Sequence, residues 1–132
     1  MGRLSERNLL GLLNARTALA GFVQRSEREA RLAGTTHAQH HVLLALGSDP
    51  NPDGPMVKDV ADALGVASPS AVELIARMVG AGLLDRSTDP RDGRRTRLQL
   101  TRRGRQLLLQ LSQTQLPSLR DLHLRNLELL SE

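Results

Sequence analysis

The sequence has no cysteine, no tryptophan and no tyrosine, and Phe22 is its only aromatic residue. Without cysteine the chain forms no disulfide, offers no thiolate to a metal and carries no thiol redox switch. Proteins that bind single-stranded DNA or RNA stack bases on aromatic side chains, so a single phenylalanine argues against that class.

Long apolar runs are also missing. No run approaches the ~18 residues that span a membrane, and no signal peptide or lipidation motif is present. We therefore expect a cytoplasmic protein with no membrane partner. No serine lies in a nucleophile elbow and no glycine-rich loop is placed to hold phosphates, so we expect neither an enzyme nor a cofactor. The length of 132 residues predicts one domain, 1–132.

The most informative segment is the turn Asp-Pro-Arg-Asp-Gly-Arg-Arg at residues 89–95. Short apolar-alternating runs flank it, Gly82–Arg86 and Arg97–Leu100, and this order predicts a β-hairpin. Arginines at an exposed hairpin tip are suited to contact phosphates or a narrow minor groove.

Positive charge is concentrated around this hairpin. The net charge of the chain is +4, yet eight of its eighteen basic residues fall within residues 86–105, against Asp89 and Asp92, which gives a local net of +6. These eight residues are Arg86, Arg91, Arg94, Arg95, Arg97, Arg102, Arg103 and Arg105. Such clustering is typical of a surface that binds nucleic acid.

The preceding segment, Val57 to Ala76, has the pattern of a helix-turn-helix. Two packed helices need apolar residues at fixed offsets, a small residue at the close approach and a glycine in the turn. The sequence provides them as Val60, Leu64, Val66, Ala71 and Leu74, with Ala61 as the small residue and Gly65 in the turn. Ser68 and Pro69 are expected to open the second helix as N-cap and first helical residue.

From Val57 to Gly104 the sequence resembles the MarR family of bacterial winged helix-turn-helix transcriptional regulators. The residues that carry the resemblance are Ala61, Gly65, Val66, Arg77, Gly82, Leu83, Asp89, Arg91, Asp92, Arg94, Leu100, Thr101 and Gly104. The resemblance implies a dimeric repressor or activator that releases DNA when it binds a small anion, a phenol or an oxidant.

Helices are expected on both sides of this core. Leucines and alanines at helical spacing follow Ser5, a candidate N-cap, and Thr36 with Gln39 forms a capping box. Thr101 should cap a last helix, which Pro117 should break or kink before Ser118 and Asp121 restart it. Leu107–Leu130 holds eleven leucines, more apolar surface than a small monomer can bury. The fold class is therefore mainly α with a small β-hairpin wing: a winged lobe at about 55–101, with dimerisation helices at about 4–33 and 102–131.

The outward positions of the second helix of the motif, together with the wing, form the predicted DNA-binding set. It comprises Ser68, Ser70, Val72, Glu73, Arg77, Arg91, Asp92, Arg94 and Arg95. Serines suit phosphates or base edges, Val72 suits a thymine methyl group and Glu73 a cytosine amine, while Arg77 suits phosphate. Arg94 is assigned to the minor groove with Asp92 bracing it, and Arg91 and Arg95 to phosphates.

Three histidines, His37, His40 and His41, fall on one short predicted helix. With Phe22 they are the candidate lining of a site for a small aromatic or anionic effector. His37 and His41 share a helix face and suit zinc, but no third or fourth ligand is evident, so no metal site is assigned.

The reading with most support is a sequence-specific regulator that binds double-stranded operator DNA as a homodimer, a repressor released by a small molecule. Two alternatives remain open. One is a metal-responsive regulator of the same fold that uses the histidines, and the other is a winged-helix module for protein–protein interaction.

Overall fold

The computed structural model describes residues 4–130, and the side chains of residues 4–122. Its elements are α1 (Glu6–Leu32), α2 (His37–Gly47), α3 (Val57–Leu64), α4 (Ser68–Gly80), β1 (Leu84–Thr88), β2 (Thr96–Leu100) and α5 (Arg102–Leu130). The predicted class, mainly α with a β-hairpin wing, is confirmed.

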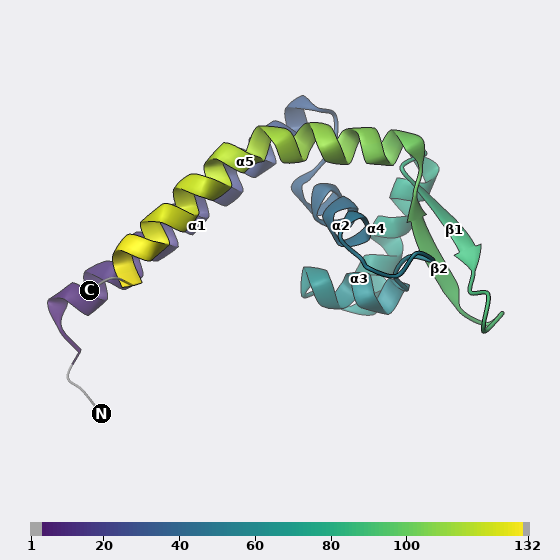
Figure 1. The fold of residues 1–132 in the computed structure, drawn as a ribbon, viewed down its shortest axis with the longest axis horizontal. Helices are drawn as coiled ribbons and strands as arrows, with labels where there is room; N and C mark the ends of the chain where they lie inside the picture. Colours follow the sequence, from purple (N-terminus) through teal and green to yellow (C-terminus); the bar gives the residue numbers. More distant parts are fainter. Residues whose placement is uncertain (1–3, 131–132) are drawn as a thin grey trace.

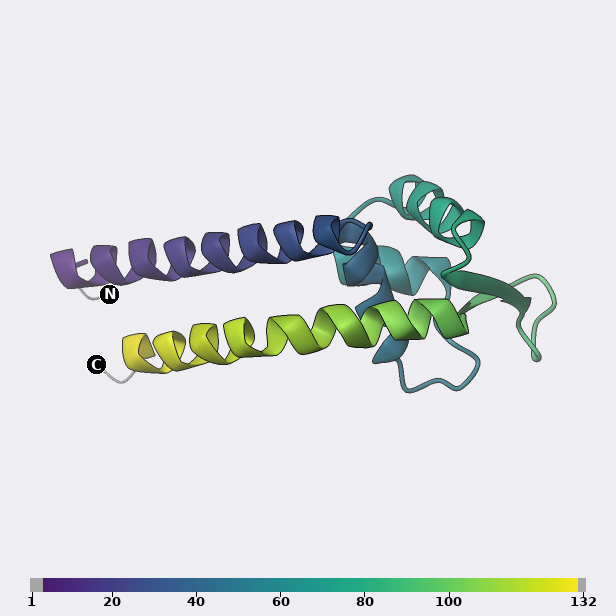
Figure 2. The ribbon, with the colours of Figure 1, turned by 90° about the horizontal axis from the view of Figure 1, so that it is seen from above.

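The chain forms a small lobe at one end of a long two-helix arm. Helices α1 and α5 run antiparallel and make up the arm, and α2, α3, α4 and the hairpin gather at the end where α1 finishes and α5 starts (Figures 1 and 2). No single helix within residues 4–130 is long and apolar enough to cross a membrane; α3 and α4 pass that test only as a pair bent by 108°.

Helix starts follow the local sequence closely. Ser5 is the N-cap of α1, and its hydroxyl accepts a hydrogen bond from the backbone N–H of Asn8. Thr36 caps α2 in the same way through Gln39. The predicted capping box there is only half formed, because the Gln39 side chain accepts a hydrogen bond from the hydroxyl of Thr35 instead.

Helices α3 and α4 form the predicted helix-turn-helix. They turn by 108°, within the range usual for this motif, and Gly65 ends α3 with φ 69°, a left-handed conformation that glycine adopts without strain. The predicted cap of α4 is wrong by one residue. Ala67, in extended conformation, is the N-cap, and Ser68 is already helical.

The core lies where the lobe meets the start of α5. Its centre consists of Val42, Leu43, Val60, Ala71, Ile75, Met78, Leu84 and Leu98, all at most 1% exposed. Of the predicted motif positions, Leu64 and Leu74 pack against this core, but Val66 is 42% exposed, so its assignment to the core is wrong. Ile75 and Met78 fill the space between the helices, because they continue the inner face that Ala71 begins.

The wing is a two-stranded antiparallel sheet in which Leu84 pairs with Leu100 and Thr88 with Thr96. A short bridge from Met56 to Arg97, and a hydrogen bond of 2.9 Å from the Leu98 N–H to the Pro55 carbonyl, attach β2 to the loop before α3. Strand β2 therefore attaches the hairpin to the rest of the lobe.

Helix α5 passes through Pro117 without interruption, so the expected break there is wrong. Proline removes one backbone hydrogen bond, but α5 packs against α1, which supports the helix. Several leucines of the predicted cluster lie beyond residue 122, where side chains are not described, and the predicted boundary at 131 lies outside the described residues.

The start of α5 fits tightly against the start of the hairpin. The Thr101 hydroxyl accepts the N–H of Gly104 at 3.0 Å, as expected for an N-cap, and donates to the Gly82 carbonyl at 2.6 Å. A Cβ at Gly104 would lie 2.1 Å from the Leu83 carbonyl oxygen. Only glycine therefore allows this approach.

Replacing Gly104 by alanine should lower the free energy of unfolding by about 1–3 kcal/mol, because helix or hairpin must shift. Gly11→Ala provides the matched control, since that helical glycine has nothing within 4 Å of the added methyl group. It should instead raise stability by about 0.5–1 kcal/mol. Urea denaturation of both variants measures the difference, and equal effects would contradict the close approach.

Candidate nucleic-acid interface

The second helix of the motif presents a polar outer face. Ala71, Ile75 and Met78 fix its buried side, and the predicted contact residues lie on the other. These exposed residues are Ser68, Ser70, Val72, Glu73 and Arg77. Helix α4 thus exposes hydroxyl, apolar and charged groups, which are the kinds of group that contact base edges and phosphates.

Glu73 and Arg77 contact each other along this face. The guanidinium of Arg77 donates to the Glu73 carboxylate at 2.8 Å, and both side chains are 68% exposed. An exposed pair of this kind contributes at most about 1 kcal/mol. Either side chain can therefore leave the pair for a base or phosphate at little cost.

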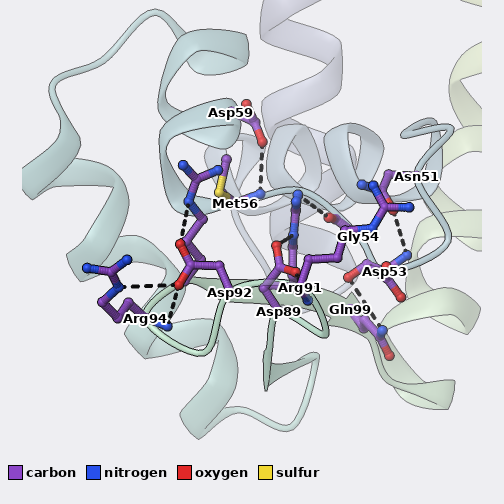
Figure 3. Close-up of polar contacts among 12 residues, drawn as sticks. Asn51, Asp53, Gly54, Met56, Asp59, Asp89, Arg91, Asp92, Arg94 and Gln99 are labelled. Carbon is purple, nitrogen blue, oxygen red and sulfur yellow. Dashed lines mark hydrogen bonds and ion pairs between the residues drawn. The ribbon is translucent and has the colours of Figure 1, made fainter.

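At the wing tip, Asp92 organises two arginines. Its Oδ1 accepts the backbone N–H of Arg94 at 3.0 Å and lies 3.4 Å from Nε of the same residue, while Oδ2 lies 3.5 Å from Nε of Arg95 (Figure 3). The Arg94 side chain is 93% exposed. The tip therefore holds its backbone in place while one guanidinium projects into solvent.

Arg97 has a different role from the other wing arginines. Its Nε donates to the Asp89 carboxylate at 2.9 Å and its terminal nitrogen to the Gly54 carbonyl at 3.2 Å, with the side chains of Arg97 and Asp89 only 16% and 6% exposed. Counting Arg97 in the nucleic-acid surface was therefore wrong. The signal that sequence analysis missed is the pairing of an acid before the turn with a base after it.

Asp89 also anchors the turn itself. Its Oδ1 accepts the backbone N–H of Arg91 at 2.7 Å. That hydrogen bond, and then the contacts with Arg97, hold the pKa of Asp89 below its usual value despite the opposing effect of burial. The carboxylate therefore stays charged at neutral pH and fixes the wing to the loop before α3.

The remaining arginines of the cluster are exposed. They are Arg86, Arg91, Arg94, Arg95, Arg102, Arg103 and Arg105. Of the two acids in this stretch, Asp89 is engaged with Arg97, and Asp92 lies at the tip. The surface around the wing therefore remains strongly positive, the electrostatic condition for contact with phosphates.

Comparison with known families fits this geometry, because residues 33–95 match the model of the MarR family. Over this segment the chain is similar to the MarR family. Its members are transcription regulators. A search of curated proteins finds no match.

Solved structures extend the likeness to nearly the whole chain. AbsC, a MarR-family transcriptional regulator from Streptomyces coelicolor, is 19% identical with a TM-score of 0.76, over 92% of this chain and 82% of its own. A mutant of MepR from Staphylococcus aureus, bound to an oligodeoxyribonucleotide, is 23% identical with a TM-score of 0.66, over 85% and 77%. CouR from Rhodococcus jostii, bound to p-coumaroyl-CoA, is 21% identical with a TM-score of 0.71, over 83% and 74%. At these identities the likeness concerns the fold.

In this MarR-type fold, two of the predicted effector residues, His37 and His40, enter a polar network in the interior. The Gln115 amide nitrogen donates to Ser26 Oγ at 2.9 Å and lies 3.2 Å from Nδ1 of His40, while Nδ1 of His37 lies 2.8 Å from Ser26 Oγ. Nε2 of His40 faces Ser112 Oγ at 3.5 Å. The network joins α1, α2 and α5.

Two hollows among the described residues, of about 170 and 350 Å³, are lined neither by Phe22 nor by the three histidines. Phe22 is half-buried, and His40, 2% exposed, is satisfied by its hydrogen bonds. The rings of His37 and His41 meet edge to face with centroids 6.4 Å apart. Within the described part of the chain, no group of three or more potential ligands of the His, Cys, Asp or Glu type gathers around a point that could hold a metal.

The buried histidine predicts a pH effect on stability. Burial, and then the nearby His37 and His41, hold the pKa of His40 below its usual value of 6.5. The unfolded chain therefore binds this proton more readily than the folded one. Stability is fully present above about pH 6.5 and falls as the pH drops from there towards the lower folded pKa.

Thermal melts between pH 7.5 and 5 should show this decline, and His40→Gln should reduce it. His41→Gln is the comparison: it removes only the smallest of the causes that lower the His40 pKa, so it should reduce the decline less than His40→Gln does. An unchanged pH profile in the His40 variant would show that His40 is not the responsible group.

Proposed function

We propose that this protein is a dimeric, sequence-specific regulator that binds double-stranded DNA through α4 and the wing. The observation that carries the proposal is that the wing arginines differ in exposure and in partners. Arg97 is consumed by the buried contact with Asp89, whereas Arg94 is almost fully exposed beside its own carboxylate. Structure alone does not need an exposed, oriented arginine at this place, but minor-groove contact does.

Helix α4 would enter the major groove of the DNA. In this arrangement Ser68 and Ser70, near its N-terminus, would contact phosphates or base edges, and Val72, which is 49% exposed, would meet a thymine methyl group. Glu73 and Arg77 would exchange their mutual ion pair for a cytosine amine and a phosphate. The structure of a MepR mutant bound to an oligodeoxyribonucleotide, which shares the fold, supports DNA binding in general.

In the wing, Arg94 would enter the minor groove with Asp92 orienting it. Arg91 and Arg95, both exposed, would contact the backbone phosphates on either side. The contacts of α4 and of Arg94 would carry base preference, and the others would provide affinity.

Surface area supports the homodimer. The chain exposes 9287 Å², whereas a compact monomer of 14.4 kDa exposes about 6,800 Å². The excess, about 2,500 Å², is of the order buried in obligate homodimers. Exposed leucines and valine lie at helical spacing along the arm, at Leu9, Leu12, Leu13, Leu19 and Val23 on α1 and at Leu109, Leu116 and Leu119 on α5.

A small-molecule effector would act where arm and lobe meet. A hollow of about 350 Å³ lies there between the α1–α2 turn, the end of α4 and the start of α5. Thr35, Gln39 and Gln106 offer polar groups, and Arg103 offers a positive charge for an acid. A ligand here would change the angle between lobe and arm, release DNA and so relieve repression. CouR, bound to a CoA ester, shows that this fold accommodates small molecules.

Replacing Arg94 by alanine should weaken operator binding by about 1–3 kcal/mol with thermal stability unchanged, because the side chain is exposed. Arg95→Ala should instead weaken binding evenly across sequences and reduce the slope of log affinity against log salt by about one. Fluorescence anisotropy with operator and random duplex at several salt concentrations measures both.

Arg28→Ala, on the arm far from the wing in sequence and exposed, is the matched control and should bind as the wild type. Wild-type operator affinity in the Arg94 variant would contradict the assignment of the wing to the minor groove. Binding of no duplex by any variant, including the wild type, would favour a protein–protein module.

The dimer should give a mass twice that of the 14.4 kDa chain in light scattering at micromolar concentration. Leu13→Glu, at a position 61% exposed in the single chain, should shift the equilibrium towards monomer because it places a charge in the interface. Leu44→Glu, 42% exposed on α2, is the matched control and should remain dimeric. A stable monomer of the unmodified chain would contradict the proposal.

A further inference from the structure

A carboxylate with an unsatisfied oxygen lies beside a second hollow. Oε2 of Glu29, near the end of α1, is buried and has no hydrogen-bond partner among the side chains and backbone that the structure describes. Glu29 lines a hollow of about 170 Å³ between α1 and α5, together with Leu32, Ala33, Gln110, Leu111 and Thr114. A buried, unpaired carboxylate oxygen is costly, so its presence requires an explanation.

The lining of this hollow contains no cation that could pair with Glu29. The hydroxyl of Thr114 donates to the Gln110 carbonyl at 3.0 Å, so its oxygen faces other partners only as an acceptor. The Thr114 oxygen and the Glu29 carboxylate are therefore two acceptors, one of them charged, beside a space that Leu32 and Leu111 also line. The complementary group is a positively charged donor with several N–H bonds.

We propose that this hollow binds the guanidinium or ammonium group of a small organic cation that carries a short apolar tail. The charged group would satisfy Glu29 Oε2 and the Thr114 oxygen, and the tail would contact Leu32 and Leu111. The hollow is smaller than pockets for drug-sized ligands, which begin at about 300 Å³. A head group with a chain of a few carbons suits this size.

The position of the hollow gives the cation a consequence for DNA. It adjoins the larger hollow that contains Arg103, since both are lined by Ala33 and Gln110. A bound cation would connect α1 to α5 at the end of the arm next to the lobe. An effect of the cation on DNA binding would deepen the proposed effector control and rests on that proposal. The binding of the cation to the hollow does not rest on it.

Calorimetry with n-butylguanidinium, and with the isosteric neutral n-butylurea, tests the binding on the full chain. The wild type should bind the cation and discriminate against the urea. Glu29→Gln should raise the Kd of the cation by about tenfold or more, because it removes a charge-assisted hydrogen bond. Glu27→Gln, two residues earlier on α1 and outside the hollow, is the matched control and should leave the Kd unchanged.

Equal binding of cation and urea, or equal affinities of wild type and Glu29→Gln, would overturn the proposal. Failure of the cation to bind at millimolar concentration would mean that the hollow holds only water and would overturn it too. A weakened dimer in Glu29→Gln without cation binding to the wild type would show that a second copy satisfies Glu29, again against the proposal.

Two measurements keep the result interpretable. Circular dichroism establishes that Glu29→Gln folds; if it does not, chemical-shift changes at Thr114 of the wild type on titration with the cation decide instead, and their absence counts against the site. Anisotropy with operator DNA is recorded separately. Cation binding without any DNA binding would therefore contradict the proposed function and leave the site intact.

Discussion

The arrangement of lobe and arm depends on the close approach of α5 to the hairpin. Gly104 lies against the Leu83 carbonyl, where a Cβ would come within 2.1 Å, and Thr101 donates from its backbone N–H to that carbonyl at 3.1 Å. The hydroxyl of Thr101 holds the Gly82 carbonyl as well. Because α5 continues into the arm, these contacts set the direction in which the lobe leaves the arm. In a dimer, that direction determines the separation of the two recognition helices.

The wing is made rigid by its acids rather than neutralised by them. Asp89 and Asp92 each accept a backbone N–H two residues further on, from Arg91 and Arg94, a local contact that orders a turn without consuming a guanidinium. Among the wing arginines, Arg97 is the one whose charge is paired in a largely buried contact. It lies on β2, where it faces the loop before α3, whereas Arg94 and Arg95 at the tip contact Asp92 and remain exposed. The exposed surface of the folded wing therefore remains positively charged.

The parts that could be predicted are those fixed by neighbours in sequence. Ser5 and Thr36 cap the starts of α1 and α2, and Gly65 ends α3, each through contacts or conformations within a few residues. The turn at 89–95 likewise closes a hairpin through its own residues. The parts that could not be predicted depend on distant contacts. Arg97 meets a carbonyl 43 residues away, and His40 meets Gln115, 75 residues away. The apolar character of Val66 predicts a core position, but the residue lies in the turn after α3 and is 42% exposed.

The arm shows why folding and association are expected to be coupled. Within α1, Glu6–Leu32, only Ser26 and Ala30 are fully buried in the single chain, and before Ser26 every side chain of the helix is half-buried or exposed. A helix gains most of its stability from packing one face, and this part of α1 lacks such packing within its own chain. A second copy on the leucines of α1 would supply it. Stability should then depend on protein concentration, and the joint that orients the lobe would become rigid only in the assembled form.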